Sequence, residues 1–291
     1  MGVSISAPLD WAQRSLRPLA WATLATNVLL VVTGGAVRLT GSGLGCPTWP
    51  RCTDHGMTPH GELNVHSAIE FSNRMLTFVL TIVAVLTLIA AWRTSVRWLA
   101  SLILAGIPVQ AVVGGISVRT HLNPWVVSIH MVSSMAIIGL AVLLLWRVYV
   151  GRPTAVAGPT VWLAWANFVV TWLVLYVGTM VTGAGPHAGD ATSPRNGLSA
   201  LQLSQLHADL VCLLIGLTIG LVFAAYAFDA PAATKQAAWI LLAVELAQGA
   251  IGWVQYFTHL PIVLVMFHML GAALVAAAAT WVLLRVREPV S

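Results

Sequence analysis

The chain has 291 residues, of which 58% are apolar and only 8% are charged, and its mean hydropathy is +0.87. Soluble domains carry about 25% charged residues, so the composition excludes a soluble globular protein and predicts a polytopic membrane protein. The net charge of +5 does not indicate nucleic-acid binding, because the basic residues are scattered singly between apolar segments.

Eight apolar stretches are long enough to cross a bilayer, which takes roughly 20 residues. They cover residues 18–38, 65–91, 98–118, 125–148, 160–182, 203–227, 236–257 and 261–284. The short connections on one side contain nine Lys and Arg residues, and those on the other side contain five. We therefore expect an all-α integral membrane protein with eight transmembrane helices and both termini in the cytoplasm.

The second half of the sequence repeats the first. An offset of 138 residues pairs Gln110 with Gln248, Gly114 with Gly252 and His130 with His268, and eight of the 22 positions from residue 110 to residue 131 are identical. Each half has four predicted helices, so the two halves insert in the same direction. We expect two four-helix bundles, residues 1–152 and 153–291.

All nine histidines fall in the outer loops or at the outer ends of predicted helices. Each even-numbered predicted helix carries one of them, at what we expect to be equal depth: His66, His130, His207 and His268. Imidazoles that project from facing helices of a bundle are suitable axial ligands of haem iron. The pattern predicts one haem per half, against the alternative that each histidine only hydrogen-bonds between helices. Zinc is less favoured, because no HExxH motif or Cys/His cluster is present.

The second predicted helix carries further polar residues on the face of His66. Glu70 and Asn73 follow it at i+4 and i+7, so all three share one face. Glu70 is suited to proton transfer near a cofactor, and the alternative is an ion pair with Arg74. Glu245, in the seventh predicted helix, is a weaker candidate with the same ambiguity.

Two of the three cysteines lie close together in the first outer loop. Cys46 and Cys52 are separated by five residues, and an oxidising compartment on that side favours a disulfide. The alternative is a redox-active thiol pair. We interpret Cys212, in the sixth predicted helix, as a small buried packing residue.

Three motifs resemble the haem A synthase family. They are RLTGSGLGCPTWPRC at residues 38–52, IEFSNR at residues 69–74 and VTGAGPHAGD at residues 181–190, and the four helical histidines complete the match. The resemblance implies that the chain converts haem O to haem A for terminal oxidase biogenesis. The C8 methyl group is oxidised to a formyl group by successive hydroxylations.

The resemblance also implies the cofactors and their sites. Haem b would be ligated by His207 and His268 in the C-terminal bundle, and haem O would face His130 in the N-terminal bundle, with Glu70 as the catalytic group. The implied location is the cell membrane. The implied partners are membrane lipid, the haem O synthase and an electron donor, and a homo-oligomer is also compatible.

One position departs from the family pattern. The family commonly has Glu-x-x-His-Arg on the second helix, whereas this chain has Asn73 between Ser72 and Arg74. Either His66 replaces the missing ligand, or His130 alone holds the substrate haem. In both cases we expect Asn73 and Arg74 to contact the haem.

Two other kinds of protein compete with this interpretation. A di-haem cytochrome b with two permanent haems accounts for the histidines, but not for Glu70 or the loop of Cys46 and Cys52. A transporter is suggested by the internal repeat, but it would need broken helices or charges near the bilayer midplane.

Overall fold

The computed structural model describes residues 7–53, 56, 58, 65–152, 158–187, 189–190 and 192–287. This part of the chain contains eight helices: α1 (Ala7–Leu39), α2 (Val65–Ala91), α3 (Arg97–Arg119), α4 (Pro124–Tyr149), α5 (Pro159–Ala184), α6 (Ala200–Ala227), α7 (Ala232–Phe257) and α8 (Ile262–Arg285). Each includes a segment long and apolar enough to cross a membrane. The prediction of an all-α multi-pass membrane protein is confirmed.

The first helix is longer than its apolar stretch. Residue 18 was the predicted start, whereas α1 begins at Ala7 and continues through Pro18. The preceding segment carries Arg14 and Arg17, which lower its hydropathy without preventing helix formation. Hydropathy therefore predicts the apolar part of α1 and misses the more polar turns before residue 18.

Short polar residues begin two of the even-numbered helices. The side chain of Asn123 accepts a hydrogen bond from the backbone N–H of Trp125, and Pro124 occupies the first turn of α4. The side chain of Ser199 likewise accepts from the backbone N–H of Gln202 at the start of α6. Such caps satisfy backbone donors that the helix itself leaves unpaired.

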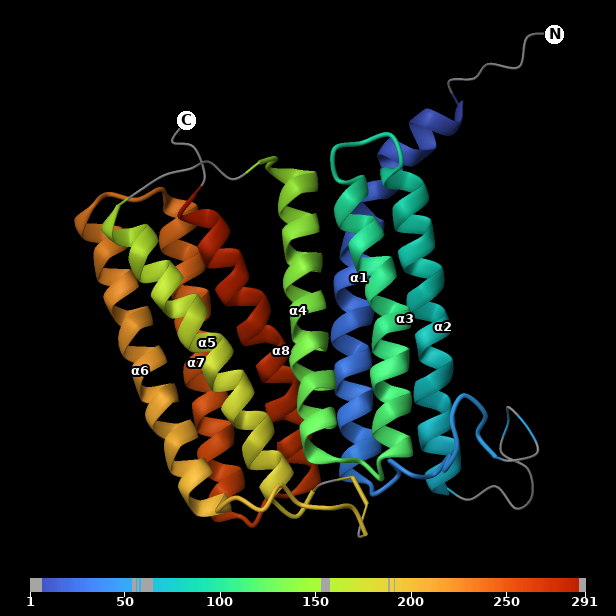
Figure 1. The fold of residues 1–291 in the computed structure, drawn as a ribbon. Coiled ribbons are helices and arrows are strands. Elements are labelled where there is room, and N and C mark those ends of the chain that lie inside the picture. Colours follow the sequence, from blue (N-terminus) through green and yellow to red (C-terminus); the bar gives the residue numbers. More distant parts are fainter. Residues whose placement is uncertain are drawn as a thin grey trace, which may run out of the picture.

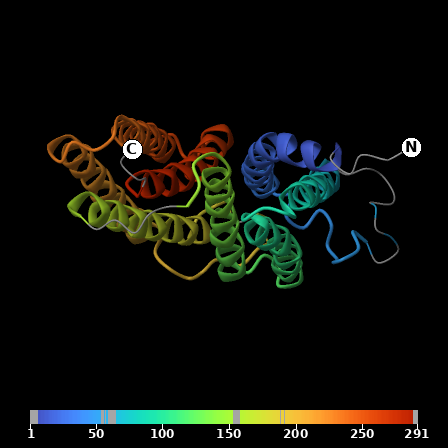
Figure 2. The same cartoon turned by 90° about the horizontal axis from the view of Figure 1, so that it is seen from above.

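The helices form two closed rings of four. Helices α1–α4, which we call the N-terminal ring, pack around one core, and helices α5–α8, the C-terminal ring, pack around another (Figures 1 and 2). The rings meet through α1 and α4 on one side and α5 and α8 on the other. The core there includes Val31, Ile138 and Ala273. Gly35 allows close packing, since a Cβ on it would lie 3.3 Å from the methyl carbon of Met269.

Loops at one end tie the rings together. This end lies opposite to the start of α1 and the end of α8 (Figure 1). The backbone N–H of Gly43 donates to the carbonyl of Gly189 at 3.1 Å, and Nε of Arg38 donates to the carbonyl of His187 at 2.7 Å. We refer to this end as the outer end.

The repeat is also present in the backbone. Leu122 donates to the carbonyl of Ser117 at 2.7 Å, and Leu260, 138 residues later, donates to Gln255 at 2.8 Å. His121 has a φ of 52° and its counterpart has a φ of 61°, the left-handed region that non-glycine residues seldom occupy. The turns before α4 and α8 are therefore structural equivalents.

Candidate functional site

Two imidazoles meet inside the C-terminal ring. The ring centroids of His207 on α6 and His268 on α8 are 6.4 Å apart, at an interplanar angle of 72°. Metal–nitrogen bonds of about 2.0–2.1 Å to one shared ion would separate two such centroids by roughly 6 Å. The spacing fits axial coordination of one iron by both side chains.

A glycine on the neighbouring helix makes room for each of these imidazoles. A Cβ on Gly178 of α5 would lie 3.1 Å from Cε1 of His207, and a Cβ on Gly252 of α7 would lie 3.1 Å from Cε1 of His268. Nδ1 of both histidines is buried without a hydrogen-bond partner among the described residues. Buried polar atoms are nearly always satisfied, so imidazoles left in this state fit a site that takes up a ligand.

The N-terminal ring contains one imidazole of this kind. His130 on α4 lies against Gly114 of α3, where a Cβ would be 3.4 Å from its Cε1, and its Nδ1 is also buried without a partner in the described part of the chain. This contact repeats that of His268 with Gly252.

His66 lies elsewhere. It is the second residue of α2, whereas the other three helical histidines are the seventh or eighth residue of their helices. The expectation of equal depth is therefore wrong for His66, because α2 starts only one residue before it. The side chain is exposed, and its Nδ1 is 2.9 Å from Oγ of Ser42. Its role as a haem ligand stays a prediction.

The pair α1–α2 has no imidazole packed on glycine. A Cβ on Gly34 would meet nothing within 4 Å, and the adjacent Thr33 donates through its hydroxyl to Oδ1 of Asn73 at 2.7 Å. Three of the four helix pairs thus share the glycine–histidine contact, and α1–α2 has a threonine–asparagine contact instead.

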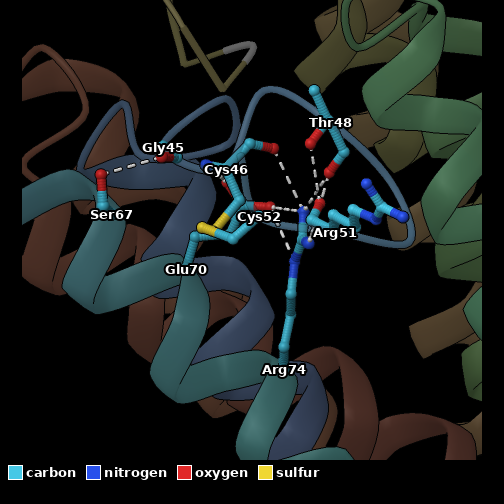
Figure 3. The surroundings of a disulfide bond; sticks show 8 residues. All are labelled: Gly45, Cys46, Thr48, Arg51, Cys52, Ser67, Glu70 and Arg74. Atoms are coloured by element: carbon cyan, nitrogen blue, oxygen red, sulfur yellow. Dashed lines mark hydrogen bonds and ion pairs between the residues drawn. A yellow bond between two sulfur atoms is a disulfide. The ribbon is translucent and has the colours of Figure 1, made fainter. Parts of the chain in front are cut away.

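Glu70 is held by partners on both of its oxygens (Figure 3). Oε1 accepts from Nη2 of Arg74 at 2.6 Å and from its Nε at 3.1 Å, while Oε2 accepts from the backbone N–H of Cys46 at 2.7 Å. Glu70 therefore forms the ion pair with Arg74 that the sequence offered as the alternative to proton transfer. The carboxylate connects α2 directly to the cysteine loop.

Arg74 extends this connection. Its Nη2 donates to the carbonyl of Cys46 at 3.1 Å, and its Nη1 donates to the carbonyls of Arg51 at 3.3 Å and Thr48 at 3.4 Å (Figure 3). Because several loop carbonyls converge on one guanidinium, Arg74 fixes the path of the loop above the outer end of α2.

The predicted disulfide between Cys46 and Cys52 is confirmed, and both cysteines are fully buried. Cys212 is exposed, so its interpretation as a buried packing residue is wrong. The apolar sequence of α6 does not distinguish a face packed on a neighbouring helix from one directed at lipid.

Glu245 is buried, and its carboxyl group is hydrogen-bonded to Thr218 in the C-terminal ring. His55 and His60 lie outside the described residues.

Known proteins share this sequence pattern. Residues 17–197 match the COX15-CtaA model, described as cytochrome oxidase assembly protein. The chain is 26% identical over 278 residues to Heme A synthase of Staphylococcus epidermidis, an alignment that covers 87% of this chain and 90% of the relative. It is 28% identical over 183 residues to Heme A synthase of Staphylococcus haemolyticus, covering 58% and 60%. It is 32% identical over 189 residues to that of Lysinibacillus sphaericus, covering 57% and 58%. The family model covers more than half of the chain, which therefore belongs to the COX15-CtaA family of cytochrome oxidase assembly proteins.

Proposed function

We propose that this protein is a haem A synthase, which oxidises the C8 methyl group of haem O to the formyl group of haem A by successive hydroxylations. The observation that carries the proposal is the contrast between the rings. One has the imidazole pair His207 and His268 at 6.4 Å, and the other has a single glycine-packed imidazole, His130, and carries the clamped disulfide loop. Relatives that align over most of their length are named Heme A synthase.

The C-terminal ring would hold haem b through His207 and His268. When bound, haem iron supplies electron transfer and the oxidising power that a methyl C–H bond requires. The protein's own contribution is to orient both imidazoles. The glycines at 178 and 252 allow these side chains to pack closely on the adjacent helices.

The N-terminal ring would receive haem O at His130, with His66, Asn73 and Arg74 as further contacts at the outer end of α2. A substrate must leave after oxidation, whereas a resident cofactor must stay. One buried imidazole instead of two fits the weaker hold that a substrate needs.

Glu70 is the proposed proton-handling group of this site. Its carboxylate also holds the cysteine loop through Cys46 and Arg74. The position of the loop therefore depends on whether Glu70 is ionised. A loop held in this way would limit the access of water from the outer side.

The proposal places the protein in the cell membrane with both termini in the cytoplasm, as the distribution of Lys and Arg favours. The loop of Cys46 and Cys52 then faces the oxidising side, where disulfides persist. The haem O synthase would supply the substrate, and a separate donor would supply electrons.

Mass analysis of the extracted non-covalent haems tests the proposal. We expect haem b together with haem O, haem A or a hydroxylated intermediate in the purified protein. In the His130→Ala variant we expect haem b to remain and the substrate-derived haems to be lost. Two equivalents of haem b alone in the wild type would instead indicate a di-haem cytochrome b.

A further inference from the structure

Glu245 is a carboxyl group buried in the middle of the C-terminal ring. Its residue is 3% exposed, and its Oε1 is 2.9 Å from Oγ1 of Thr218 on α6. That hydroxyl is also 2.5 Å from Nδ2 of Asn167 on α5. Oε2 is buried and has no hydrogen-bond partner among the described residues. Ionisable groups in the interior of a membrane protein are costly and are generally functional.

The Thr218 hydroxyl can serve either protonation state of this carboxyl. It lies 3.0 Å from the carbonyl of Leu214 as well as 2.9 Å from Glu245, but it has only one proton to donate. With an ionised carboxylate, the hydroxyl donates to Glu245. With a neutral carboxyl, Glu245 donates to the hydroxyl, which turns its proton to Leu214. Asn167 donates to the same oxygen in both arrangements, so the network accepts a proton without rearrangement of the helices.

No fixed cation holds Glu245 in its ionised form. Glu245 takes part in neither of the ion pairs Arg74–Glu70 and Lys235–Asp229 that described residues form. Helix α5 has no ionisable residue other than Tyr176, and α7 has only Lys235, ten residues away or about 15 Å of helix, and Tyr256 besides Glu245. Helix α6 contributes Asp209, Cys212, Tyr226 and His207, and α8 contributes His268 and Arg285.

The imidazole pair is the functional group that lies toward the outer end from Glu245. Glu245 precedes Gly252, the glycine packed on His268, by seven residues, or about 10 Å of helix. Thr218 follows His207 by eleven residues, or about 16 Å. Charges at such separations interact strongly when little water screens them.

The N-terminal ring has no equivalent group. The repeat offset of 138 residues places Ile107 at the position of Glu245, and Ile107 is a buried part of an apolar cluster with Leu80 and Ala84. The carboxyl is therefore specific to the ring that carries the imidazole pair.

We propose that Glu245 is a redox-linked proton site of the C-terminal ring. The Glu245 carboxylate would bind one proton from water when a one-electron reductant reduces the haem held by His207 and His268. The added negative charge is thereby neutralised inside the membrane. Glu245 would return this proton to water when a one-electron oxidant takes the electron. This inference rests on the proposed function, because it requires a haem in this ring.

A potentiometric titration of the purified holoprotein tests the inference, with dithionite as reductant and the low-spin haem absorbance as the signal. In the wild type we expect the midpoint potential to fall as pH rises through the range in which Glu245 titrates. In Glu245→Gln we expect the haem to be retained and this pH dependence to disappear. Asp229→Asn is the control, since it makes the same chemical change at an exposed carboxylate far from the imidazole pair and should keep the slope.

The results that would contradict the inference differ from those that would contradict the proposed function. A wild-type potential independent of pH, or a slope that persists in Glu245→Gln, overturns the inference while the haem assignment stands. A slope that is lost in Asp229→Asn and kept in Glu245→Gln also overturns it. Absence of any haem ligated by His207 and His268 refutes the haem assignment of the proposed function, and the inference with it.

Infrared difference spectroscopy of the wild type avoids the need for a variant at Glu245. With ¹³C-labelled glutamate we expect a protonated carboxyl C=O band to appear on reduction and to shift with the label. Thr218→Val, which removes the hydroxyl and keeps the shape, should retain the band but move its frequency. A reduced-minus-oxidised spectrum without a label-sensitive carboxyl band contradicts the proton uptake.

Discussion

The two rings share a sequence repeat and a turn geometry, but they differ in what they present at the outer end. The C-terminal ring brings His207 and His268 together, each packed on a glycine. The N-terminal ring keeps one such contact, at His130, and has Asn73 hydrogen-bonded to Thr33 on its other helix pair. In the proposed function, these few side-chain differences would let one half hold a resident haem and the other half exchange a substrate haem.

The loops differ between the rings in a corresponding way. The N-terminal ring carries the disulfide loop, which Glu70 and Arg74 clamp onto α2. The α5–α6 loop of the C-terminal ring crosses toward α1, where Arg38 binds the carbonyl of His187. Hydrogen bonds therefore join the loops of the two rings at the outer end of the molecule.

The largest expected effect comes from removing one imidazole of the pair. His207→Ala and His268→Ala should each abolish the low-spin haem b signal, because an iron that loses one axial ligand cannot keep that spin state and is held less tightly. Visible and paramagnetic resonance spectra of the purified variants measure this. His259→Asn is a suitable control, since asparagine tolerates the positive φ of that turn. Unchanged spectra in both alanine variants would refute the assignment.

Changing Glu70 to Gln should affect the other ring. We expect both haem sites to assemble and the yield of haem A to fall about a hundredfold or more, in line with the usual contribution of general acid–base groups. Oxidation should stall before the formyl stage, as mass analysis of the extracted haems would show.

Arg74→Gln separates the two roles of Glu70. It releases the loop carbonyls while leaving the carboxylate in place, so the disulfide should become accessible to a mild reductant and to thiol labelling. If Glu70→Gln shows the same labelling and no stalled intermediate, its role is to position the loop. Normal haem A production by Glu70→Gln would refute proton handling.

The helices and one of the two expected imidazole pairs were predictable from the sequence, where the signal is local. Apolar length defined seven helices to within four residues, and the histidine spacing predicted the meeting of His207 with His268. The contacts of Asn73 with Thr33 and of Glu70 with Cys46 depend on how α1 and the loop dock on α2, which no local pattern encodes. Cys212 was misjudged for the same reason, because apolar periodicity is weak when both lipid and protein are apolar.

Asn73→His would test the comparison by adding the missing imidazole. Asn73 is hydrogen-bonded to Thr33 of α1, so the new imidazole would replace the threonine–asparagine contact of this helix pair. We expect a second low-spin haem signal in this variant and a haem A output reduced severalfold, because a doubly ligated substrate is bound more tightly and oxidised less readily. A spectrum identical to that of the wild type would show that the ring cannot position a ligand from α2.

His66→Ala should have a smaller effect than His130→Ala. His66 lies at the exposed start of α2 and is hydrogen-bonded to Ser42, so its contribution to haem O retention should be partial. Substrate-haem occupancy measured in both variants ranks the two residues. Occupancy unaltered by His66→Ala would show that His130 is the lone imidazole ligand of this ring.

The smallest expected effect concerns Asp190, in the loop that crosses between the rings. The hydroxyl and the backbone N–H of Thr192 donate to its Oδ1 at 2.6 and 2.8 Å. These bonds lower the pKa of Asp190 below its usual value, with a small further lowering from the charge of His66. The bonds to the ionised form therefore stabilise the loop above the unfolded-state pKa of about 3.9. This stabilisation is lost as pH falls through the lower, folded-state pKa.

Asp190→Asn should consequently increase hydrogen exchange in residues 183–199 slightly at pH 7, and the difference from the wild type should vanish in acid below the folded-state pKa. Asp190 is partly exposed, so water screens the interaction and its contribution stays below about 1 kcal/mol. Asp229→Asn, at the opposite end of the molecule and paired with Lys235, should leave exchange in this loop unchanged. A difference between Asp190→Asn and the wild type that persists in acid would show that the side chain acts through its shape and not through its charge.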